Sequence, residues 1–344
     1  MKRHLLSVRK IVVAVVMLGL ILIPGFAIAE TVIKLGHADP ADVYTSKKGA
    51  AAEVFKNLVE AETGGEVIVN LYPAGQLGGE RELVEATQLG TVQMCMVSGA
   101  IAGVFKSAMV LDLPYLFSSA PVAWKVLDGP FGEELSAALL KQTGLRNLAY
   151  GETGFRNFTN SKHPIKSPAD MKGLKFRVME TPLYITMVKA LGGLPTPIAW
   201  PEVYAALQQG VVDGQENPVS TIAYAKFNEV QKYVTLDGHT YGADFFIMND
   251  NTYQKLTPEQ QGTVKRAAVV ASTVGRAIQQ LNSAMGVASL KELGMEFYAP
   301  NAEERTQFKE ATQGPVIEWM KTQIDPQWIE KAMQAVEQVE AEIE

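Results

Sequence analysis

Short apolar runs alternate with stretches of helical periodicity from residue 32 onward, and this alternation restricts the fold more than any other feature. Short alternating or apolar runs are typical of strands, whereas apolar residues three and four apart indicate helices. Strands are expected at residues 32–35, 66–72, 92–97, 146–150, 155–159, 174–179, 236–239, 245–249 and 295–298. Helices are expected at residues 46–62, 80–88, 120–141, 168–172, 181–191, 201–209, 258–293, 302–323 and 326–344. This alternation predicts an α/β fold.

The helix expected at residues 258–293 is unusually long. Helices in globular proteins average about 10–14 residues, so one of this length would more naturally bridge two lobes than lie within one. The length of 344 residues also favours two domains, since one domain has roughly 100–200 residues. We therefore expect two lobes with a long helix spanning the hinge.

The N-terminus has the three parts of a secretory signal peptide. A basic segment comes first, the apolar run 11–23 follows, and Ala27-Ile28-Ala29 forms a cleavage site after Pro24-Gly25. The alternative is a membrane anchor, but the apolar run is shorter than the ~20 residues that span a bilayer. No cysteine stands near residue 30, which argues against a lipoprotein anchor. We expect residues 1–29 to be removed and the mature protein to lie in the periplasm.

Composition limits the classes of partner. Lys and Arg number 31 against 37 Asp and Glu, a net charge of −6, which argues against a general affinity for nucleic acid or anionic membranes. Loss of four basic residues with the signal peptide (Lys2, Arg3, Arg9 and Lys10) would bring the net charge to −10. The single cysteine, Cys95, excludes a disulfide framework and a cysteine-based zinc cluster.

Motifs for catalysis are missing from the sequence. It has no H-E-x-x-H, G-x-S-x-G, Walker A or G-x-G-x-x-G pattern. The glycine-rich segment 73–80 lies between an expected strand and helix, but it lacks the Lys-Ser/Thr ending of a phosphate loop. His37, His163 and His239 have no metal-ligand spacing. We therefore expect no enzyme activity, no cofactor and no metal.

Two arginines stand in strand-like segments, Arg156 in 153–160 and Arg177 in 174–179. A buried guanidinium cannot lose its proton and needs a partner. That partner is either a carboxylate at a strand end or an external anion, and only Glu152 is an acidic neighbour of Arg156 in sequence. Asn217 lies in the polar segment 210–218, which we interpret as a loop at a cleft edge.

These segments occur in an order that resembles the DctP family, the solute-binding proteins of tripartite ATP-independent periplasmic (TRAP) transporters. The residues that carry the resemblance are 155–160, 168–178, 193–208 and 212–218. The resemblance implies two α/β lobes that close on an organic acid. It also implies delivery to a small and a large permease subunit, with sodium-coupled uptake.

The resemblance also assigns residues. Arg177 matches the family's carboxylate clamp, Arg156 its second arginine, and Asn217 an asparagine that also contacts the carboxylate. Trp200 stands where the family often has an aromatic residue against the ligand, and His37 where some members contact it.

Two positions depart from the sialic-acid-binding branch. Val97 replaces a glutamate and removes an acceptor for hydroxyl groups, which argues against sialic acid. Glu180 replaces an asparagine, and it would either accept from a substrate hydroxyl or amine or pair with Arg156. Phe155 is expected to add an apolar wall beside Trp200.

The sequence thus predicts a type II-like periplasmic binding protein with its cleft between residues 30–153 plus 242–281 and residues 154–241 plus 282–344. The ligand is expected to be a small organic carboxylate, either a C4-dicarboxylate or a hydroxy, sugar or aromatic acid. We expect a monomer or weak dimer. The alternatives are a binding subunit of an ABC importer or sensor system, or a secreted enzyme acting on an organic acid.

Overall fold

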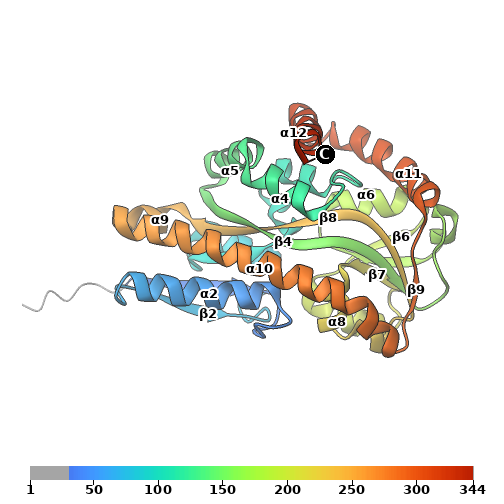
Figure 1. Cartoon of the computed structure of the whole chain (residues 1–344), viewed down its shortest axis with the longest axis horizontal. Helices are drawn as coiled ribbons and strands as arrows, with labels where there is room; N and C mark the ends of the chain where they lie inside the picture. The colour runs from blue at the N-terminus through green and yellow to red at the C-terminus, as the bar shows by residue number, and fades with distance from the viewer. Residues whose placement is uncertain (1–30, 344) are drawn as a thin grey trace, which may run out of the picture. The chain divides into compact units, whose positions relative to one another are not determined.

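Two long antiparallel strands, β4 (Leu145–Asn160) and β8 (Tyr233–Asn249), form the middle of the sheet (Figure 1). The computed structural model describes residues 31–343. Within them the strands form one nine-stranded sheet in the order β2-β1-β3-β8-β4-β7-β5-β6, and β9 pairs with β8. The expected signal peptide lies outside the described residues.

One end of the sheet is built from the N-terminal part of the chain. β1 (Thr31–His37) is parallel to β2 (Val67–Tyr72) and β3 (Met94–Val97), and β3 is antiparallel to β8. The connecting helices are α2 (Lys47–Glu62) and α3 (Glu80–Leu89).

The other end of the sheet places β5 (Lys175–Val178) between β6 (Leu194–Pro197) and β7 (Gly214–Asn217), all parallel, with β7 antiparallel to β4. The remaining strand there is β9 (Glu296–Tyr298). Its helices are α6 (Pro182–Ala190), α7 (Val203–Gln208) and α8 (Val219–Tyr224).

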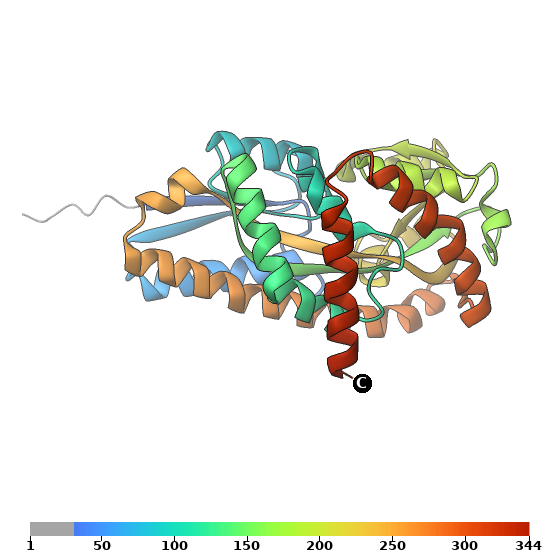
Figure 2. The ribbon, with the colours of Figure 1, turned by 90° about the horizontal axis from the view of Figure 1, so that it is seen from above.

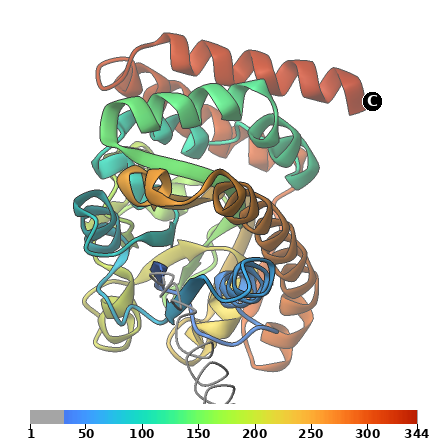
Figure 3. The same ribbon diagram turned by 90° about the vertical axis from the view of Figure 1, so that its left-hand side faces the viewer.

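Helices cover both faces of the central strands (Figures 1 and 3). On one face lie α4 (Ala120–Asp128) and α5 (Pro130–Thr143), with α12 (Gln327–Ile343) packed against both (Figure 2). The other face carries α10 (Pro258–Glu292), which packs on α2, β4 and α8. Further helices are α9 (Asp250–Lys255) and α11 (Ala302–Met320), and short 3-10 helices lie at Gly99–Gly103, Lys106–Asp112, Pro168–Met171, Trp200–Glu202 and Phe227–Glu229.

Successive side chains of a strand point to opposite faces of the sheet, and two apolar clusters of the core lie on these two faces. In β3, Cys95 and Val97 belong to the apolar cluster on the α4 and α5 face, whereas Met94 and Met96 belong to the cluster under α2 and α10. Because β3 is buried on both faces, it reads as a continuous apolar run. Cys95, the single cysteine of the sequence, is fully buried in this core.

Most expected elements are present, and the differences have local causes. The long helix is confirmed at Pro258–Glu292. The expected helix 120–141 is two helices, because Pro130 lacks the N–H that would continue α4. The strands expected at 146–150 and 155–159 are one strand, β4, with register irregularities instead of a break. Those expected at 236–239 and 245–249 likewise merge into β8.

The interpretation of residues 210–218 as a loop was wrong for its second half. Gly214–Asn217 forms the fully buried strand β7, which lies between β4 and β5. Because its side chains are polar, β7 does not stand out as an apolar run in the sequence. Inside the protein these polar side chains have hydrogen-bond partners.

The lobe boundaries stay a prediction. The expected crossings near residues 153, 241 and 281 fall inside β4, β8 and α10, three continuous elements. In the part of the chain that the structure describes, no helix has the length and hydropathy needed to cross a membrane.

Candidate binding site

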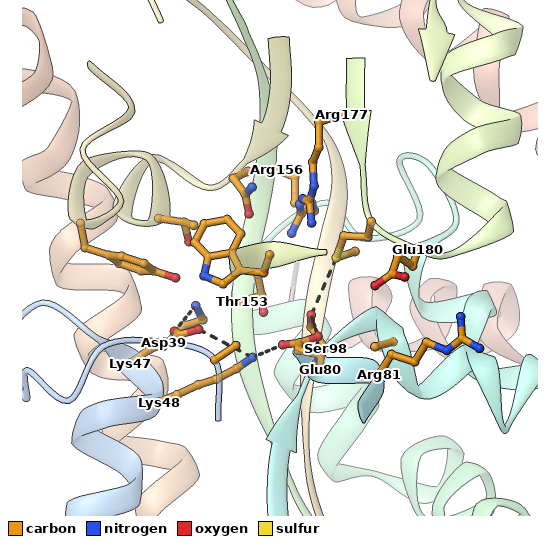
Figure 4. A pocket seen from close by; sticks show the side chains of 17 residues that line it. Asp39, Lys47, Lys48, Glu80, Arg81, Ser98, Thr153, Arg156, Arg177 and Glu180 are labelled. Carbon is orange, nitrogen blue, oxygen red and sulfur yellow. Dashed lines mark hydrogen bonds and ion pairs between the residues drawn. The ribbon is translucent and has the colours of Figure 1, made fainter. Parts of the chain in front are cut away.

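One pocket gathers polar and charged side chains at the carboxyl ends of parallel strands. Asp39 follows β1, Ser98 follows β3, Glu180 follows β5, and Asn217 ends β7. The carboxyl edge of parallel strands is the usual place for ligands in open α/β sheets. The residues that line the pocket are Ala38, Asp39, Lys47, Lys48, Glu80, Arg81, Ser98, Ala100, Thr153, Arg156, Arg177, Met179, Glu180, Trp200, Asn217, Thr221 and Tyr224 (Figure 4).

Arg177, on β5, presents a guanidinium that the described protein leaves partly unpaired. Its Nε donates to the carbonyl oxygen of Ile198 at 2.9 Å, and the guanidinium lies 5.9 Å from the ring centroid of Trp200. Its Nη1 is buried with no hydrogen-bond partner among residues 31–343. Burial lowers the pKa of Arg177 to about 10, and the charge of Arg156 contributes in the same direction. The group therefore stays charged at neutral pH and can accept an anionic partner.

Arg156, on β4, has a carboxylate partner inside the protein. Its Nε and Nη2 both donate to the carboxylate of Glu216 on β7, the Nη2 bond at 2.8 Å. Nη2 also donates to the carbonyl oxygen of Glu216 at 2.7 Å. Burial alone would lower the pKa of Arg156, but the charge of Glu216 more than offsets it. The charge of Arg156 is thus balanced before any ligand arrives.

His239, on β8, extends this pair into a buried chain of charges. Its Nε2 lies 3.2 Å from Glu216 and its Nδ1 2.9 Å from Asp237. Burial alone would lower the pKa of His239, but the two carboxylates raise it to about 9. The imidazolium that results helps to hold the Glu216 carboxylate against Arg156.

The opposite side of the pocket carries two lysines from the first turn of α2 (Figure 4). Lys47 Nζ lies 3.0 Å from Asp39, and Lys48 Nζ lies 2.6 Å from Glu80 and 3.2 Å from Asp244. The Glu80 carboxylate also accepts from Ser98 N at 3.0 Å and Ser98 Oγ at 2.8 Å. Both lysines are buried. Burial alone would lower their pKa values, but the carboxylates raise the pKa of each above its usual value.

Five of the eight expected site residues line this pocket, namely Arg156, Arg177, Glu180, Trp200 and Asn217. Of the two interpretations of Glu180, the pairing with Arg156 was wrong, because Arg156 pairs with Glu216. Glu180 is exposed at the rim and forms no ion pair within residues 31–343. Asn217 is buried, and its amide donates to the side chain of Gln215 at 2.5 Å.

The other three expected residues do not line it. Phe155 precedes Arg156 on β4, so its side chain points to the opposite face, where it packs on Tyr241 with ring centroids 5.4 Å apart. Val97 is fully buried in the core. His37 faces a separate cavity that Gly49 and Asn70 also line, and burial lowers its pKa to about 4.

Sequence reasoning missed the lysine side of the pocket. Lys47 and Lys48 directly follow Ser46, whose side chain caps α2 by accepting from Gly49 N at 2.9 Å. Cations at a helix N-terminus are unfavourable because they oppose the helix dipole. Two lysines at this position therefore indicate that carboxylates or a ligand outside the helix interact with them. Glu216 was missed as a partner of Arg156, since the two are distant in sequence and meet only because β7 pairs with β4.

Comparisons with known proteins agree with this geometry. The family described as "Bacterial extracellular solute-binding protein, family 7" (DctP) matches residues 40–323. A solute-binding protein of Verminephrobacter eiseniae is 42% identical over 270 residues, 78% of this chain and 79% of that protein.

Two crystal structures resemble the fold. A TRAP periplasmic solute binding protein from Bordetella bronchispeptica, with density interpreted as pantoate, is 38% identical with a TM-score of 0.83 over 89% of this chain and 99% of that one. The sugar acid binding protein DctPAm from Advenella mimigardefordensis, in complex with galactonate, is 32% identical with a TM-score of 0.86 over 90% and 99% of the two chains. The mixed α/β sheet and its covering helices thus match two-lobe periplasmic binding proteins. With the family match extending over most of the sequence, this chain belongs to the DctP family of solute-binding proteins, which bind organic acids and work with TRAP membrane components.

Proposed function

We propose that this pocket captures a small organic carboxylate and that Arg177 binds the carboxylate group. The observation that carries the proposal is the buried guanidinium of Arg177, whose Nη1 has no partner among the described residues although a cation there needs one. A carboxylate would meet this fork with two parallel hydrogen bonds, which fix orientation as well as charge. Asn217 and Trp200 lie in the same pocket and would complete the carboxylate end.

The two sides of the pocket come from the two expected lobes. Asp39, Lys47, Lys48 and Glu80 belong to 30–153, whereas Arg177 belongs to 154–241. Contacts already join the sides, since Lys47 Nζ lies 5.6 Å from the ring centroid of Tyr224 and Thr181 Oγ1 donates to the carbonyl oxygen of Gly99 at 3.3 Å. Closure of the lobes would remove the carboxylate and Arg177 from water. Their attraction is stronger in the closed cleft, because the dielectric constant there is lower than in water.

Delivery of the captured acid would be to the membrane subunits of a TRAP transporter, a small and a large one, with sodium-coupled uptake. Export by the signal peptide 1–29 would place the protein in the periplasm, which is where the family works. The family consists of receptors for transport, which supports binding over catalysis. A sensor system or ABC importer is the competing assignment, and neighbouring permease genes would decide between them.

A thermal-shift screen over organic acids tests the proposal. A ligand that binds only the native state stabilises it by about 2.7 kcal/mol at 100 times its Kd, which raises the Tm by several degrees. The panel includes pantoate, galactonate, succinate and aromatic acids, with the matching amides or alcohols as controls. We expect at least one acid, and none of its uncharged controls, to raise the Tm. Equal shifts from acids and controls would contradict a site built around Arg177.

A further inference from the structure

The side of the pocket opposite Arg177 holds a group of five charged residues, the buried Asp39, Lys47, Lys48 and Asp244 and the partly buried Glu80, called here the lysine–carboxylate cluster. Two lysines facing an arginine resemble a second clamp, which would suit a dicarboxylate. We infer the opposite: the lysine–carboxylate cluster rejects a second carboxylate and selects a hydroxylated monocarboxylate. This inference rests on the proposed function, because it assumes that Arg177 holds one carboxylate.

Lys48 lies among the carboxylates of the cluster and donates a hydrogen bond to Glu80. Its ammonium has three N–H groups. Nζ lies 2.6 Å from Glu80, 3.2 Å from Asp244 and 3.9 Å from Asp39, so carboxylates surround it on three sides. Asp244 is held in turn by Thr153 Oγ1, which donates to it at 2.7 Å. A ligand carboxylate that approached Lys48 would have to share its charge with these three carboxylates, which would repel it.

The charge count of the cluster leaves no excess cation. Two lysines face three carboxylates, so the formal sum is −1. Burial raises the pKa of Asp244, and protonation of that group would bring the sum to zero. In neither state is the sum positive. A second ligand carboxylate would therefore lose its hydration without meeting an uncompensated cation, and would face Asp39 and Glu80.

At the Arg177 end of the pocket the charges of the described residues leave one cation without a carboxylate partner. Arg156 is balanced by Glu216, and His239 by Asp237. At the rim, exposed Arg81 lies 3.1 Å from Glu85. Among the pocket residues that the structure describes, Arg177 is thus the buried cation without a carboxylate at ion-pair distance. The pocket has one place for one carboxylate.

Groups that can bond a ligand hydroxyl line the rest of the pocket. Thr221 is buried and its Oγ1 has no hydrogen-bond partner among residues 31–343. Lys47 has one carboxylate, Asp39, within 4 Å, so its remaining N–H groups can donate to a ligand hydroxyl. Such a hydroxyl can also donate to Asp39, whereas a carboxylate cannot. Hydroxyl groups, which donate and accept, therefore fit this side of the pocket.

Matched acids that differ at one carbon test the inference by calorimetry. Galactonate and galactarate share a six-carbon skeleton, with a terminal CH2OH in the first and a second carboxylate in the second. Erythronate and meso-tartrate form the same pair at four carbons. We expect the monocarboxylate to bind at least about tenfold more tightly than its dicarboxylate in the pair that fits, because an unmatched buried charge costs more than 1.4 kcal/mol. Equal or tighter binding of the dicarboxylate would overturn the inference.

Variants of the cluster identify the cause. Asp39→Asn removes one negative charge from the cluster. It should therefore reduce the ratio of monocarboxylate to dicarboxylate affinity by about tenfold. Glu80→Gln makes the same change and serves if Asp39→Asn does not fold by circular dichroism. Glu62→Gln removes the same charge from the surface of α2 and should keep the wild-type ratio of monocarboxylate to dicarboxylate affinity. An unchanged ratio in a folded cluster variant would contradict the inference.

The outcomes separate the two proposals. If monocarboxylates and dicarboxylates bind equally and Arg177→Lys weakens both, the proposed function holds and the inference fails. If folded wild-type protein binds no organic acid, both fail.

Discussion

Arg156 and Glu216 form a buried ion pair in which two guanidinium nitrogens donate to one carboxylate. Both side chains are almost fully buried, at 2% and 0% exposure. The pair separates the roles of the two arginines in the pocket, because Arg156 is neutralised by the protein while Arg177 keeps an unpartnered Nη1 among the described residues. Arg156 therefore gives the pocket N–H donors in a fixed position without net charge, whereas Arg177 gives it a net positive charge.

We expect Glu216→Gln to lower the free energy of unfolding by about 3–5 kcal/mol, because it leaves Arg156 as an uncompensated buried cation, whereas His239 keeps Asp237. Urea denaturation followed by circular dichroism measures the change. Glu85→Gln, which breaks an exposed pair with Arg81, should cost less than about 1 kcal/mol. A similar small loss in both variants would show that the buried pair is not structural.

The stability of the protein should fall between pH 6.5 and 9 through His239. The folded pKa of about 9 lies above the usual 6.5, so the native state retains the proton longer than the unfolded chain does. The stabilisation is complete below pH 6.5 and is lost as pH rises through 9, by about 3 kcal/mol at most.

Urea denaturation at pH 6.5 and 9 measures this loss. The variant His239→Gln should reduce it, whereas exposed His163→Gln should leave it as in wild type. An equal loss in wild type and His239→Gln would refute the assignment to His239.

Gly154→Ala should destabilise the protein by about 1–3 kcal/mol. Gly154 has a φ of 101°, and an added Cβ would lie 2.5 Å from Nε2 of Gln279 on α10. The matched control is Gly314→Ala in α11, where no neighbour lies within 4 Å of an added Cβ and alanine favours the helix. Thermal melts of both variants give the comparison, and a neutral Gly154→Ala would argue that β4 adjusts freely at this position.

The sequence alone identified the elements whose periodicity is strong, such as α10 and the apolar strand β3. It failed where polar residues form buried structure. β7 carries Gln215, Glu216 and Asn217, which local pattern assigns to a loop, and the strand exists because β4 and β5 satisfy its backbone on both sides. Tertiary pairing of this kind overrides local propensity.

The pocket was predictable where the family resemblance supplied single residues, as for Arg177 and Trp200. It was not predictable where function depends on pairs. Phe155 and Arg156 are neighbours in sequence, but only the strand period decides which one faces the pocket. The balance of charge at Lys48 depends on Glu80 and Asp244, which come from separate elements.

Calorimetry of Arg177→Lys tests the central claim most directly. The ligand is the acid that raises the Tm of wild-type protein most, and Arg266→Lys, an exposed change on α10, is the matched control. We predict that Arg177→Lys folds normally and binds at least about thirtyfold more weakly, because lysine cannot reproduce the bidentate fork, while Arg266→Lys keeps wild-type affinity. Undiminished affinity in Arg177→Lys would contradict the account.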